Sequence, residues 1–474
     1  MRRFATGKRL LGVLIVIAMI LPGCSAQRPS PPSEESSASQ DKRAQADPEI
    51  LQAVDGLGVN ANVHSWNNGE LKPAIDTIAQ MGPLTWRVIV ERADWEPVRH
   101  GTDASVFDWD YYEKIYTAGK MADLFSTIAY INSKPGQKVS VNVMGGVPQW
   151  MGGTEIKPEF EDYWVRMIAS MVYFARENRK LDFTLLSPLN ETDLNGIEGP
   201  LVGPEQYVRL MHKLSDALDK LGLSDIRFVG PDTANADKAV QEYLPPMSKD
   251  RVVMDRTVHF GIHSYDGTTA NAAKPLGNAA SSPTNVWVTE FAGPCPGCDD
   301  GAPNPGNWDT AQDTAGLAIS LLRSGVSGLQ FYDAWDGYYE HHGSVGYWGL
   351  LAYDEASHSY SPRKNYYVLR QLFEFVRPGS HLIDCTSSVQ DVQLVCLLEP
   401  GTSQLVIYGS NAGNRKATVQ ISAPAADAAA DVSFSQTDAT SNLVSNPNVG
   451  FANGSTSVVV APRSVFTLAS QPGR

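Results

Sequence analysis

The chain has 474 residues, of which 42% are hydrophobic and 19% are charged, so it is long enough for two domains and can bury a core along most of its length. Its formal net charge is −14, and no basic patch stands out, which argues against nucleic-acid binding. A neutral or cationic partner fits this charge better than a strongly anionic one.

The first 24 residues have the features of an export signal rather than of a folded element. Four basic residues precede an apolar run over 10–21, which is too short to span a membrane comfortably. The run ends in Leu-Pro-Gly-Cys at 21–24 and resembles the bacterial lipoprotein signal, which is cut before a cysteine that becomes lipidated. We therefore predict lipidation of Cys24 and an exported, membrane-anchored or cell-surface protein; an ordinary signal peptide with a chance cysteine is the alternative.

Residues 25–48 contain Ser, Pro, Gln, Glu and Ala and almost no large apolar residue. Such a segment cannot bury enough apolar surface to fold. We interpret it as a disordered tether between the lipidated cysteine and the folded part of the chain.

Residues 49–377 alternate strand-like runs rich in Val, Ile and Phe with segments of 3.6-residue period. Eight strands with helices between them favour a (β/α)8 TIM barrel over a doubly wound sheet. The predicted strands are 56–63, 84–90, 138–144, 182–187, 226–230, 257–262, 285–289 and 327–332.

Helices are predicted between and after these strands, most clearly at 69–81, 109–132, 161–179, 204–222, 309–324 and 361–375. The weakest helix of the pattern is expected at 266–283, where a composition rich in Ala, Gly, Thr, Asn and Pro also suits a loop.

After Pro378 the helical patterns end and short alternating strands follow, separated by Gly, Asn and Pro. This pattern predicts a small β-sandwich domain over 378–474, which we interpret as a supporting domain rather than an independent binding module. Its predicted strands are 391–398, 403–409, 416–421, 430–435, 455–460 and 464–468.

Four cysteines remain once Cys24 is set aside, and they form two local pairs. An exported protein permits disulfides, so we predict the bonds Cys295–Cys298 and Cys385–Cys396. The Cys-Pro-Gly-Cys run could instead be a redox or zinc motif, although a zinc site would want a second close pair or nearby histidines.

Side chains just past the carboxyl ends of barrel strands point into a shared cavity. The residues at these positions are dominated by aromatic, carboxylate and amide groups. They include His64, Trp66, Glu91, Arg92, Asp94, Trp95, Gln149, Trp150, Asn190, Glu191, Asp193, His263, Tyr265, Asp266, Glu290, Tyr332, Asp333, Trp335 and Asp336, with Arg87 inside the second strand.

This set of residues is typical of a carbohydrate-binding cleft, in which aromatic faces stack on sugar rings and polar groups bind hydroxyls. The sequence contains neither a glycine-rich phosphate loop nor a Gly-x-Ser-x-Gly elbow, and no His, Asp or Glu cluster has metal-ligand spacing. We therefore predict no cofactor and no metal, and we interpret His341 and His342 as a loop pair.

Two of the carboxyl groups are placed for glycoside hydrolysis, which needs a proton donor and a second carboxylate flanking the bond. Glu191 follows the fourth strand and Glu290 the seventh, so the two face each other across the barrel mouth. Opposite strands can bring two Glu carboxyl groups within roughly 5–5.5 Å, the separation of retaining enzymes.

The run Leu-Ser-Pro-Leu-Asn-Glu at 186–191 resembles the strand-four signature of the clan A glycoside hydrolases, most like family 30, and Trp-Val-Thr-Glu-Phe at 287–291 resembles the strand-seven nucleophile of that clan. His263-Ser264-Tyr265 looks like its strand-six element, Arg87 like its strand-two arginine, and the C-terminal sandwich is similar to that of families 30 and 39.

The resemblance implies a retaining glycoside hydrolase acting on a glycan, with a β-linkage expected because the clan acts mostly on equatorial bonds. Glu191 would be the general acid/base and Glu290 the nucleophile, while Asn190 would bind the sugar 2-hydroxyl. Arg87 and Tyr265 would hold Glu290 and keep it ionised. Trp335 would pack beneath the sugar next to the scissile bond. Further substrate contacts are predicted for His263, Trp150 and Trp66.

The sequence departs from the family pattern at Thr192, where Pro often follows Asn-Glu, and in the cysteine insertion beside Glu290. A carbohydrate-binding lipoprotein without catalysis is the alternative function, against which the intact glutamate pair argues. A surface adhesin would not need these convergent side chains, whereas a transglycosylase would use the same ones. We expect a monomer.

Overall fold

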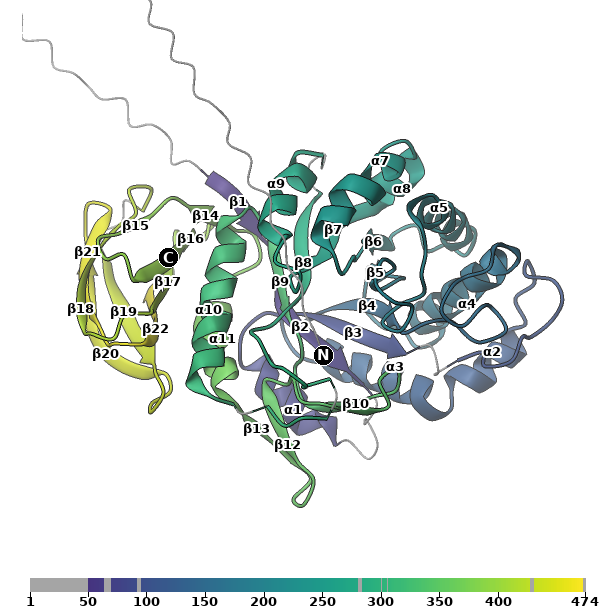
Figure 1. Cartoon of the computed structure of the whole chain (residues 1–474), viewed down its shortest axis with the longest axis horizontal. Coiled ribbons are helices and arrows are strands. Elements are labelled where there is room, and N and C mark those ends of the chain that lie inside the picture. The colour runs from purple at the N-terminus through teal and green to yellow at the C-terminus, as the bar shows by residue number, and fades with distance from the viewer. Residues whose placement is uncertain are drawn as a thin grey trace, which may run out of the picture. The chain divides into compact units, whose positions relative to one another are not determined.

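Eight parallel strands close into a barrel at the positions that the sequence predicts (Figure 1). The computed structural model describes residues 50–63, 70–91, 95–279, 284–299, 301–304, 306–426 and 430–471. The predicted (β/α)8 fold is confirmed. The barrel strands are β2 (Gly56–Asn62), β3 (Thr85–Glu91), β4 (Lys138–Met144), β5 (Leu185–Ser187), β6 (Arg227–Val229), β7 (Thr257–His263), β8 (Asn285–Phe291) and β9 (Gly328–Phe331).

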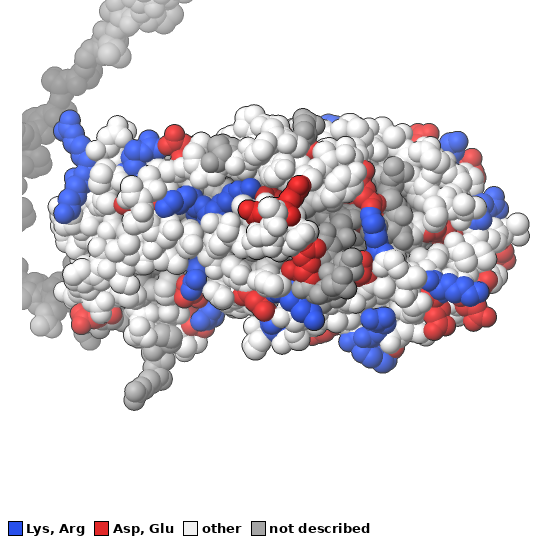
Figure 2. Space-filling model, turned by 90° about the horizontal axis from the view of Figure 1, so that it is seen from below, with Lys and Arg blue, Asp and Glu red and all other residues white. Residues whose placement is uncertain are grey.

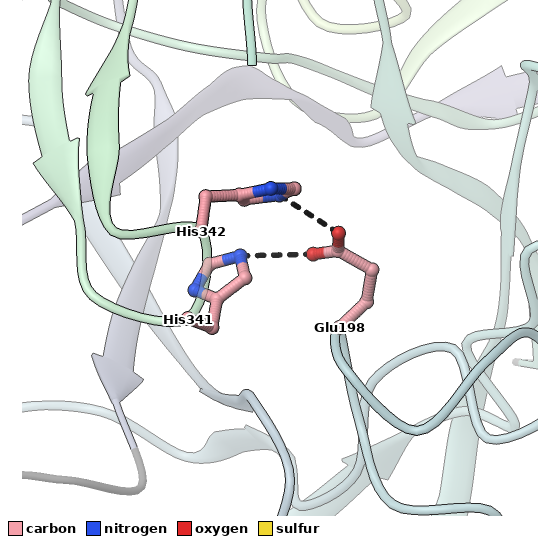
Figure 3. A group of neighbouring side chains, drawn as sticks. All are labelled: Glu198, His341 and His342. Atoms are coloured by element: carbon pink, nitrogen blue, oxygen red, sulfur yellow. Dashed lines mark ion pairs between the residues drawn. The ribbon is translucent and has the colours of Figure 1, made fainter. Parts of the chain in front are cut away.

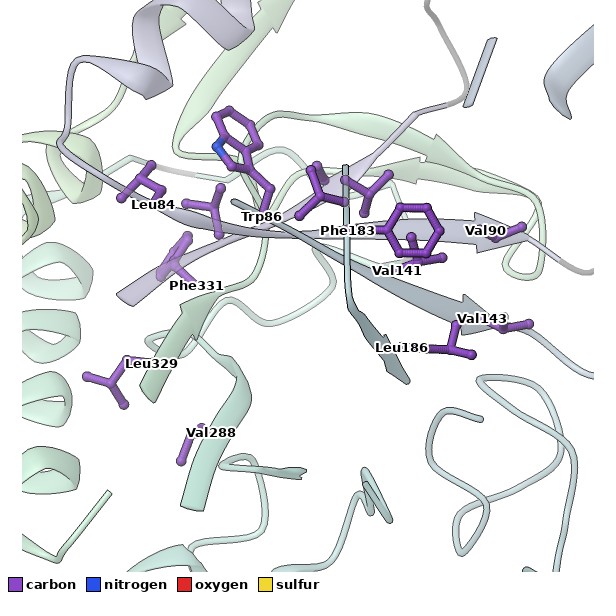
Figure 4. Packing of buried hydrophobic residues seen from close by; sticks show 14 of the residues in the cluster. Leu84, Trp86, Val90, Val141, Val143, Phe183, Leu186, Val288, Leu329 and Phe331 are labelled. Atoms are coloured by element: carbon purple, nitrogen blue, oxygen red, sulfur yellow. The ribbon is translucent and has the colours of Figure 1, made fainter. Parts of the chain in front are cut away.

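Side chains along each barrel strand lie alternately in two different environments, because successive side chains of a strand point to opposite faces. On β3, Trp86, Val88 and Val90 belong to the main hydrophobic cluster, part of which is drawn in Figure 4. Arg87, between two of them, instead reaches polar side chains of other barrel strands. The barrel therefore packs an apolar layer outside and keeps polar groups at its centre.

Most predicted helices are present, with one correction. The segment expected as a single helix over 109–132 forms two, separated by Thr117 and Ala118. Gly119, which begins the second helix, has a φ of +54° that favours glycine. The helices of the predicted set are α1 (Leu71–Ala79), α2 (Trp109–Tyr116), α3 (Gly119–Asn132), α4 (Glu161–Tyr173), η4 (Phe174–Asn178), α5 (Pro204–Lys220), α10 (Trp308–Arg323) and α11 (Lys364–Phe373). The short helix η3 (Pro158–Phe160), just before α4, was not predicted.

The segment 266–283, for which a loop was the alternative, contains the helix α9 (Thr269–Ala279). Ala272, Ala273 and Leu276 are buried at helical spacing, and their packing outweighs the low helix propensity of Pro275 inside the helix. Four short helical segments between β6 and β7 were not predicted, because each is too short to show a period: α6 (Ala236–Lys238), η5 (Ala239–Tyr243), α7 (Leu244–Met247) and α8 (Arg251–Arg256).

The C-terminal strands, joined by β1 from the other end of the described chain, form a seven-stranded and a three-stranded antiparallel sheet, as a sandwich requires. The order in the larger sheet is β1-β14-β16-β17-β22-β19-β20, and in the smaller it is β15-β18-β21. The strands are β1 (Ile50–Val54), β14 (Ser380–Ile383), β15 (Thr386–Ser387), β16 (Val392–Leu398), β17 (Leu405–Asn411), β18 (Ala417–Ser422), β19 (Ala430–Thr437), β20 (Val444–Phe451), β21 (Ser455–Val460) and β22 (Ser464–Ser470).

The centre of the seven-stranded sheet, at β16 and β17, packs on both faces. Leu394 and Ile407 lie in the sandwich core, whereas Val395 and Tyr408, one residue further along, belong to the same cluster as the barrel. Tyr408 also donates a hydrogen bond to the carbonyl of Val368 in α11. Because barrel and sandwich share one buried cluster, the boundary at 377/378 stays a prediction.

Two hairpins follow the last barrel strand, β10 (Gly337–Tyr339) with β11 (Ser344–Gly346) and β12 (Leu351–Asp354) with β13 (Ser359–Pro362). The predicted disulfides Cys295–Cys298 and Cys385–Cys396 are both present. Among the helices of the described part, none combines the length and apolar character of a membrane span. The predicted signal segment, the lipidation site Cys24 and the tether lie outside the described residues.

Candidate active site

Glu191 and Glu290 meet at the carboxyl end of the barrel. Glu191 follows β5 and Glu290 lies near the end of β8, and both side chains are almost fully buried. A carboxylate oxygen of Glu191, one of Glu290 and a ring nitrogen of His263 all lie within 4.8 Å of one another. An inverting enzyme needs space between one carboxyl group and the sugar for the attacking water molecule. Two carboxyl groups this close do not leave that space.

Arg87 joins the polar residues at the barrel centre. Its Nη1 donates to Glu290 Oε1 at 2.6 Å and to Asn60 Oδ1 at 2.6 Å. Its Nη2 donates to Asn190 Oδ1 at 2.6 Å and to Asp232 Oδ2 at 2.8 Å. One rigid guanidinium group thus fixes side chains from four other strands or strand ends, which a lysine could not do.

Asp232, which sequence reasoning missed, is the main buried counter-ion of Arg87. It follows the cis peptide Gly230–Pro231, and its carboxylate accepts hydrogen bonds from Ser187 at 2.6 Å and from the Thr289 hydroxyl. Burial raises the pKa of Asp232, but Arg87, His263 and Ser187 together outweigh it and hold the pKa well below its usual value. Asp232 is therefore an anion that balances Arg87.

His263 lies between the two glutamates. Its Nδ1 is 2.6 Å from Glu191 Oε1, and its Nε2 is 3.6 Å from both Glu290 Oε1 and Asp232 Oδ1. Burial lowers the pKa of this histidine, but Glu290 and Glu191 outweigh it and raise the pKa well above its usual value. The imidazole is thus held as a cation against Glu191.

Glu290 is protonated more readily than an ordinary glutamate because of its environment. Burial raises the pKa of Glu290 to about 7, against the opposing effects of His263 and Arg87. The Tyr265 hydroxyl lies 3.5 Å from its second oxygen, Oε2. Two cations and one hydroxyl thus surround a carboxyl group that is cut off from bulk water.

Asn190 is held from both ends of its amide. Its Oδ1 accepts from Arg87, and its Nδ2 donates to the Glu198 carbonyl at 3.0 Å. Thr192, at the position where the family often has Pro, is buried with its hydroxyl 2.9 Å from the Tyr243 hydroxyl. Proline has no hydroxyl, so this departure from the family pattern adds a contact to the loop after β5.

A cavity of about 680 Å³ opens in front of the glutamate pair. Its walls come from the loops after β5, β6, β7, β8 and β9. The lining residues include Glu191, Asp193, Leu194, Glu198, Ala234, Asn235, Lys238, Tyr265, Asp266, Glu290, Asp299, Tyr332, His342 and Trp348.

The aromatic residues of this cavity are partly different from those predicted. Trp335 is 1% exposed, and its indole donates to the Asn62 carbonyl at 2.9 Å. Its predicted role under the sugar is therefore wrong, and Tyr332 and Trp348 line the cavity instead.

Trp150 packs edge-on against Phe160 and Tyr163, its indole donates to the Glu96 carbonyl, and it is not among the residues that line the cavity. The predicted contact of Trp150 with substrate is therefore not supported. Trp66, the third predicted tryptophan, lies outside the described residues.

The disulfide insertion after β8 contributes to the cavity wall. Asp299, next to Cys298, lines the cavity and accepts a hydrogen bond from the Trp348 indole. The backbone N–H of Tyr347 donates to the Cys298 carbonyl at 3.0 Å. The cysteine pair thus joins the segment after β8 to the segment that carries Trp348.

The surface agrees with the acidic composition. On the face drawn in Figure 2, the basic side chains of the described residues form separate small groups among acidic ones rather than one continuous basic patch. This surface gives no support to nucleic-acid binding.

Comparison with solved structures identifies the class of fold. No protein-family model and no curated protein matches the sequence. A family 30 endoxylanase from Clostridium papyrosolvens superimposes with a TM-score of 0.68 at 15% identity, over 90% of this chain and 98% of the other. SrfJ from Salmonella typhimurium gives 0.66 at 14% identity, over 92% and 94%. A family 39 β-xylosidase from Caulobacter crescentus gives 0.54 at 14% identity, over 91% and 98%.

The chain therefore has the barrel-and-sandwich fold of the clan A glycoside hydrolases. Three family 30 enzymes superimpose on it with TM-scores of 0.66 to 0.68, which is better than the 0.54 of the family 39 enzyme. The resemblance seen in the sequence motifs is thus confirmed at the level of the fold.

Proposed function

We propose that this protein is a retaining glycoside hydrolase acting on a β-linked glycan. One observation carries the proposal: carboxylate oxygens of Glu191 and Glu290 lie within 4.8 Å of each other at the floor of a cavity. Retaining enzymes place their two carboxyl groups roughly 5–5.5 Å apart, and inverting enzymes place them clearly further apart. Fold neighbours named as an endoxylanase and an endo-β1,6-glucanase support a β-linked substrate.

The proposed mechanism has two displacements. Glu290, held by Arg87 and Tyr265, attacks the anomeric carbon, and Glu191 donates a proton to the leaving oxygen. A glycosyl ester on Glu290 forms as the glycosidic bond breaks. Glu191, now a carboxylate, takes a proton from water, whose oxygen displaces Glu290 and gives a product of the original configuration.

The surrounding residues support these roles. His263 orients the Glu191 carboxyl group through the 2.6 Å contact. The second N–H of the Asn190 amide is the group that remains for a sugar hydroxyl once the first has bound the Glu198 carbonyl. Tyr332 and Trp348 replace Trp335 as proposed sugar-stacking residues.

We also propose that the enzyme is exported and anchored through a lipidated Cys24, because a basic segment, an apolar run and Leu-Pro-Gly-Cys follow each other in the order of a lipoprotein signal. Mass spectrometry of the protein purified from membranes tests this proposal. A diacylated N-terminal cysteine is expected. An N-terminus without Cys24 contradicts the proposal.

The function is tested with the full chain on a panel of aryl β-glycosides and β-linked polysaccharides. Glu290→Gln is expected to lose activity by at least about 10⁴-fold, since it removes the nucleophile. Glu191→Ala is expected to keep activity on substrates with good leaving groups, to be rescued by azide and to give the β-glycosyl azide. Glu113→Gln on the exposed face of α2 is the matched control.

Two outcomes contradict the proposal. If NMR shows that the product first formed has the inverted anomeric configuration, the retaining mechanism is excluded. No turnover on any substrate, together with sugar binding that neither variant changes, identifies a non-catalytic carbohydrate-binding protein instead.

A further inference from the structure

Two loops that lie far apart in the sequence bring three potential metal ligands together at the wall of the cavity (Figure 3). Glu198 lies in the loop after β5, and His341 and His342 lie in the turn between β10 and β11. His341 Nε2 is 2.9 Å from Glu198 Oε2, and His342 Nε2 is 2.8 Å from Glu198 Oε1. The sequence did not reveal this cluster, because the ligands are more than 140 residues apart.

A buried carboxylate fixes the ring of His341. Nδ1 of His341 lies 2.6 Å from Glu91 Oε1, and both side chains are almost wholly buried. When Nδ1 carries the proton and donates it to Glu91, the lone pair of Nε2 is directed away from that bond. A histidine held by a carboxylate in this way is the usual outer arrangement of a protein zinc ligand.

The other ring nitrogen of His341 is buried and faces Glu198. Nε2 lies 2.9 Å from Glu198 Oε2 as an ion pair, but the contact does not have the geometry of a hydrogen bond. A buried nitrogen in a contact of poor hydrogen-bond geometry is only partly satisfied. A cation bound between this nitrogen and the Glu198 carboxylate would satisfy both groups.

The backbone holds Glu198 in place. Its carbonyl accepts from the Gly145 N–H at 2.8 Å and from the Asn190 amide at 3.0 Å. The next residue, Gly199, packs directly on the Asn190 carbonyl, where any Cβ would collide with that oxygen. The backbone that carries the carboxylate is therefore fixed before any ligand binds, which favours a site over a chance contact.

We propose that Glu198, His341 and His342 bind a divalent transition-metal ion, with Zn²⁺ the best match to two imidazoles and one carboxylate. Zinc bonds of about 2.0–2.2 Å separate neighbouring ligand atoms by roughly 3–3.5 Å, so a small opening of the two contacts admits the ion. Glu198 and His342 line the cavity, so a fourth coordination position faces it and is open to water or a substrate oxygen.

A second cluster of similar composition does not compete for this ion. Glu191, His263 and Glu290 also lie within 4.8 Å of one another. There, however, the Arg87 guanidinium already occupies the cation position, 2.6 Å from Glu290. A metal ion beside this arginine would be repelled by it.

The test measures zinc binding to the full chain after a chelator has removed bound metal. One Zn²⁺ per chain is expected by elemental analysis after dialysis, and Co²⁺ is expected to give the visible absorption of a four-coordinate ion. Glu198→Gln and His342→Gln are expected to weaken zinc affinity by at least 100-fold in competition with a chromophoric chelator. Glu91→Gln, which acts through His341, is expected to weaken it about 10–100-fold.

Two controls keep the result specific. His358→Gln changes an exposed histidine that faces Glu70 and should keep one zinc per chain. Glu290→Gln should also keep it, which separates the two clusters. Because the readout is bound metal, this inference does not rest on glycoside hydrolysis.

Zinc should also raise the melting temperature of the unaltered chain but not that of Glu198→Gln, and the metal-free melting temperatures check that each variant is folded. Substoichiometric zinc, or zinc bound equally well by Glu198→Gln, overturns the proposal. Either result leaves a metal-free ion pair, in which Glu198 and Glu91 outweigh burial and raise the pKa of His341 to about 10.

Discussion

Nη2 of Arg87 and Oδ2 of Asp232 form an ion pair of 2.8 Å that solvent does not reach from either side. Asp232 also accepts from Ser187 and Thr289, so the pair ties β3 to the ends of three other strands. Removing one partner of such a pair destabilises the fold by more than the attraction between the two charges, because the remaining charge stays buried without compensation.

Asp232→Asn is therefore expected to lower the free energy of unfolding by about 3–5 kcal/mol. Urea denaturation measures this loss. Asp255→Asn, which breaks the exposed pair with Arg251, is the matched control and should leave the urea midpoint unchanged. Equal effects of the two variants would mean that the buried pair contributes no more than a surface one.

The pH dependence of activity follows from Glu290. Burial raises its pKa to about 7, and only its ionised form can act as the proposed nucleophile. Hence kcat/KM should fall tenfold per pH unit below about 7, measured from pH 4 to 9 on an aryl glycoside. A profile that is flat between pH 5 and 7 contradicts this assignment.

The same group contributes to stability with the opposite trend. Its folded-state pKa lies above the unfolded value of 4.5, so its stabilising contribution is complete below pH 4.5 and is lost as the pH rises through about 7. Glu290→Gln should remove this component from the pH dependence of the unfolding free energy. An unchanged pH dependence in the variant would assign it to other groups.

Two tryptophans near the last barrel strand should respond differently to truncation. Trp348→Ala should raise KM with little loss of unfolding free energy, since Trp348 lines the cavity. Trp335→Ala should lower the unfolding free energy by about 3–5 kcal/mol, since Trp335 is fully buried. Urea denaturation and substrate kinetics on both variants measure the contrast, and a rise in KM without destabilisation in Trp335→Ala would restore its predicted sugar contact.

His263 is expected to act through Glu191. His263→Asn should lower kcat by about 10–100-fold, with a larger loss for poor leaving groups, because proton donation then limits the rate. His259→Asn is the control, since His259 lies near the other end of the same strand and packs on Trp287. A loss independent of the leaving group would place the effect of His263 on Glu290 instead.

The barrel could be predicted from the sequence because each of its strands is a short apolar run between turn signals. The elements that were missed lack such a signal. β20 is mostly exposed and contains Asn446, Pro447 and Asn448, so it shows no apolar alternation. α6 to α8 are too short for a helical period. The helix α9 was expected, but its pattern was weak because it is stabilised by tertiary packing around a proline.

The site was predictable where a residue lies at or just beyond the end of a strand, as Glu191, Glu290 and Tyr265 do. Asp232 follows the short strand β6 and the cis peptide Gly230–Pro231, and no motif in the sequence pointed to it. Glu198 and Trp348 lie deep in long loops, and their position depends on contacts with Asn190 and Asp299 that no local pattern encodes.

The pairing of β1 with β14 has a consequence for how the chain folds. Residues 50–54 lie beside residues 380–383, so the first described strand finds its partner only after more than 300 further residues have been synthesised. The barrel can close earlier, since its own strands run from Gly56 to Phe331. A ribosome-released chain truncated at 377 would keep β1 without a partner and would expose the faces of α10 and α11 that the sheet covers. Complete folding thus depends on the last sheet, and such a truncation should aggregate rather than yield an isolated barrel.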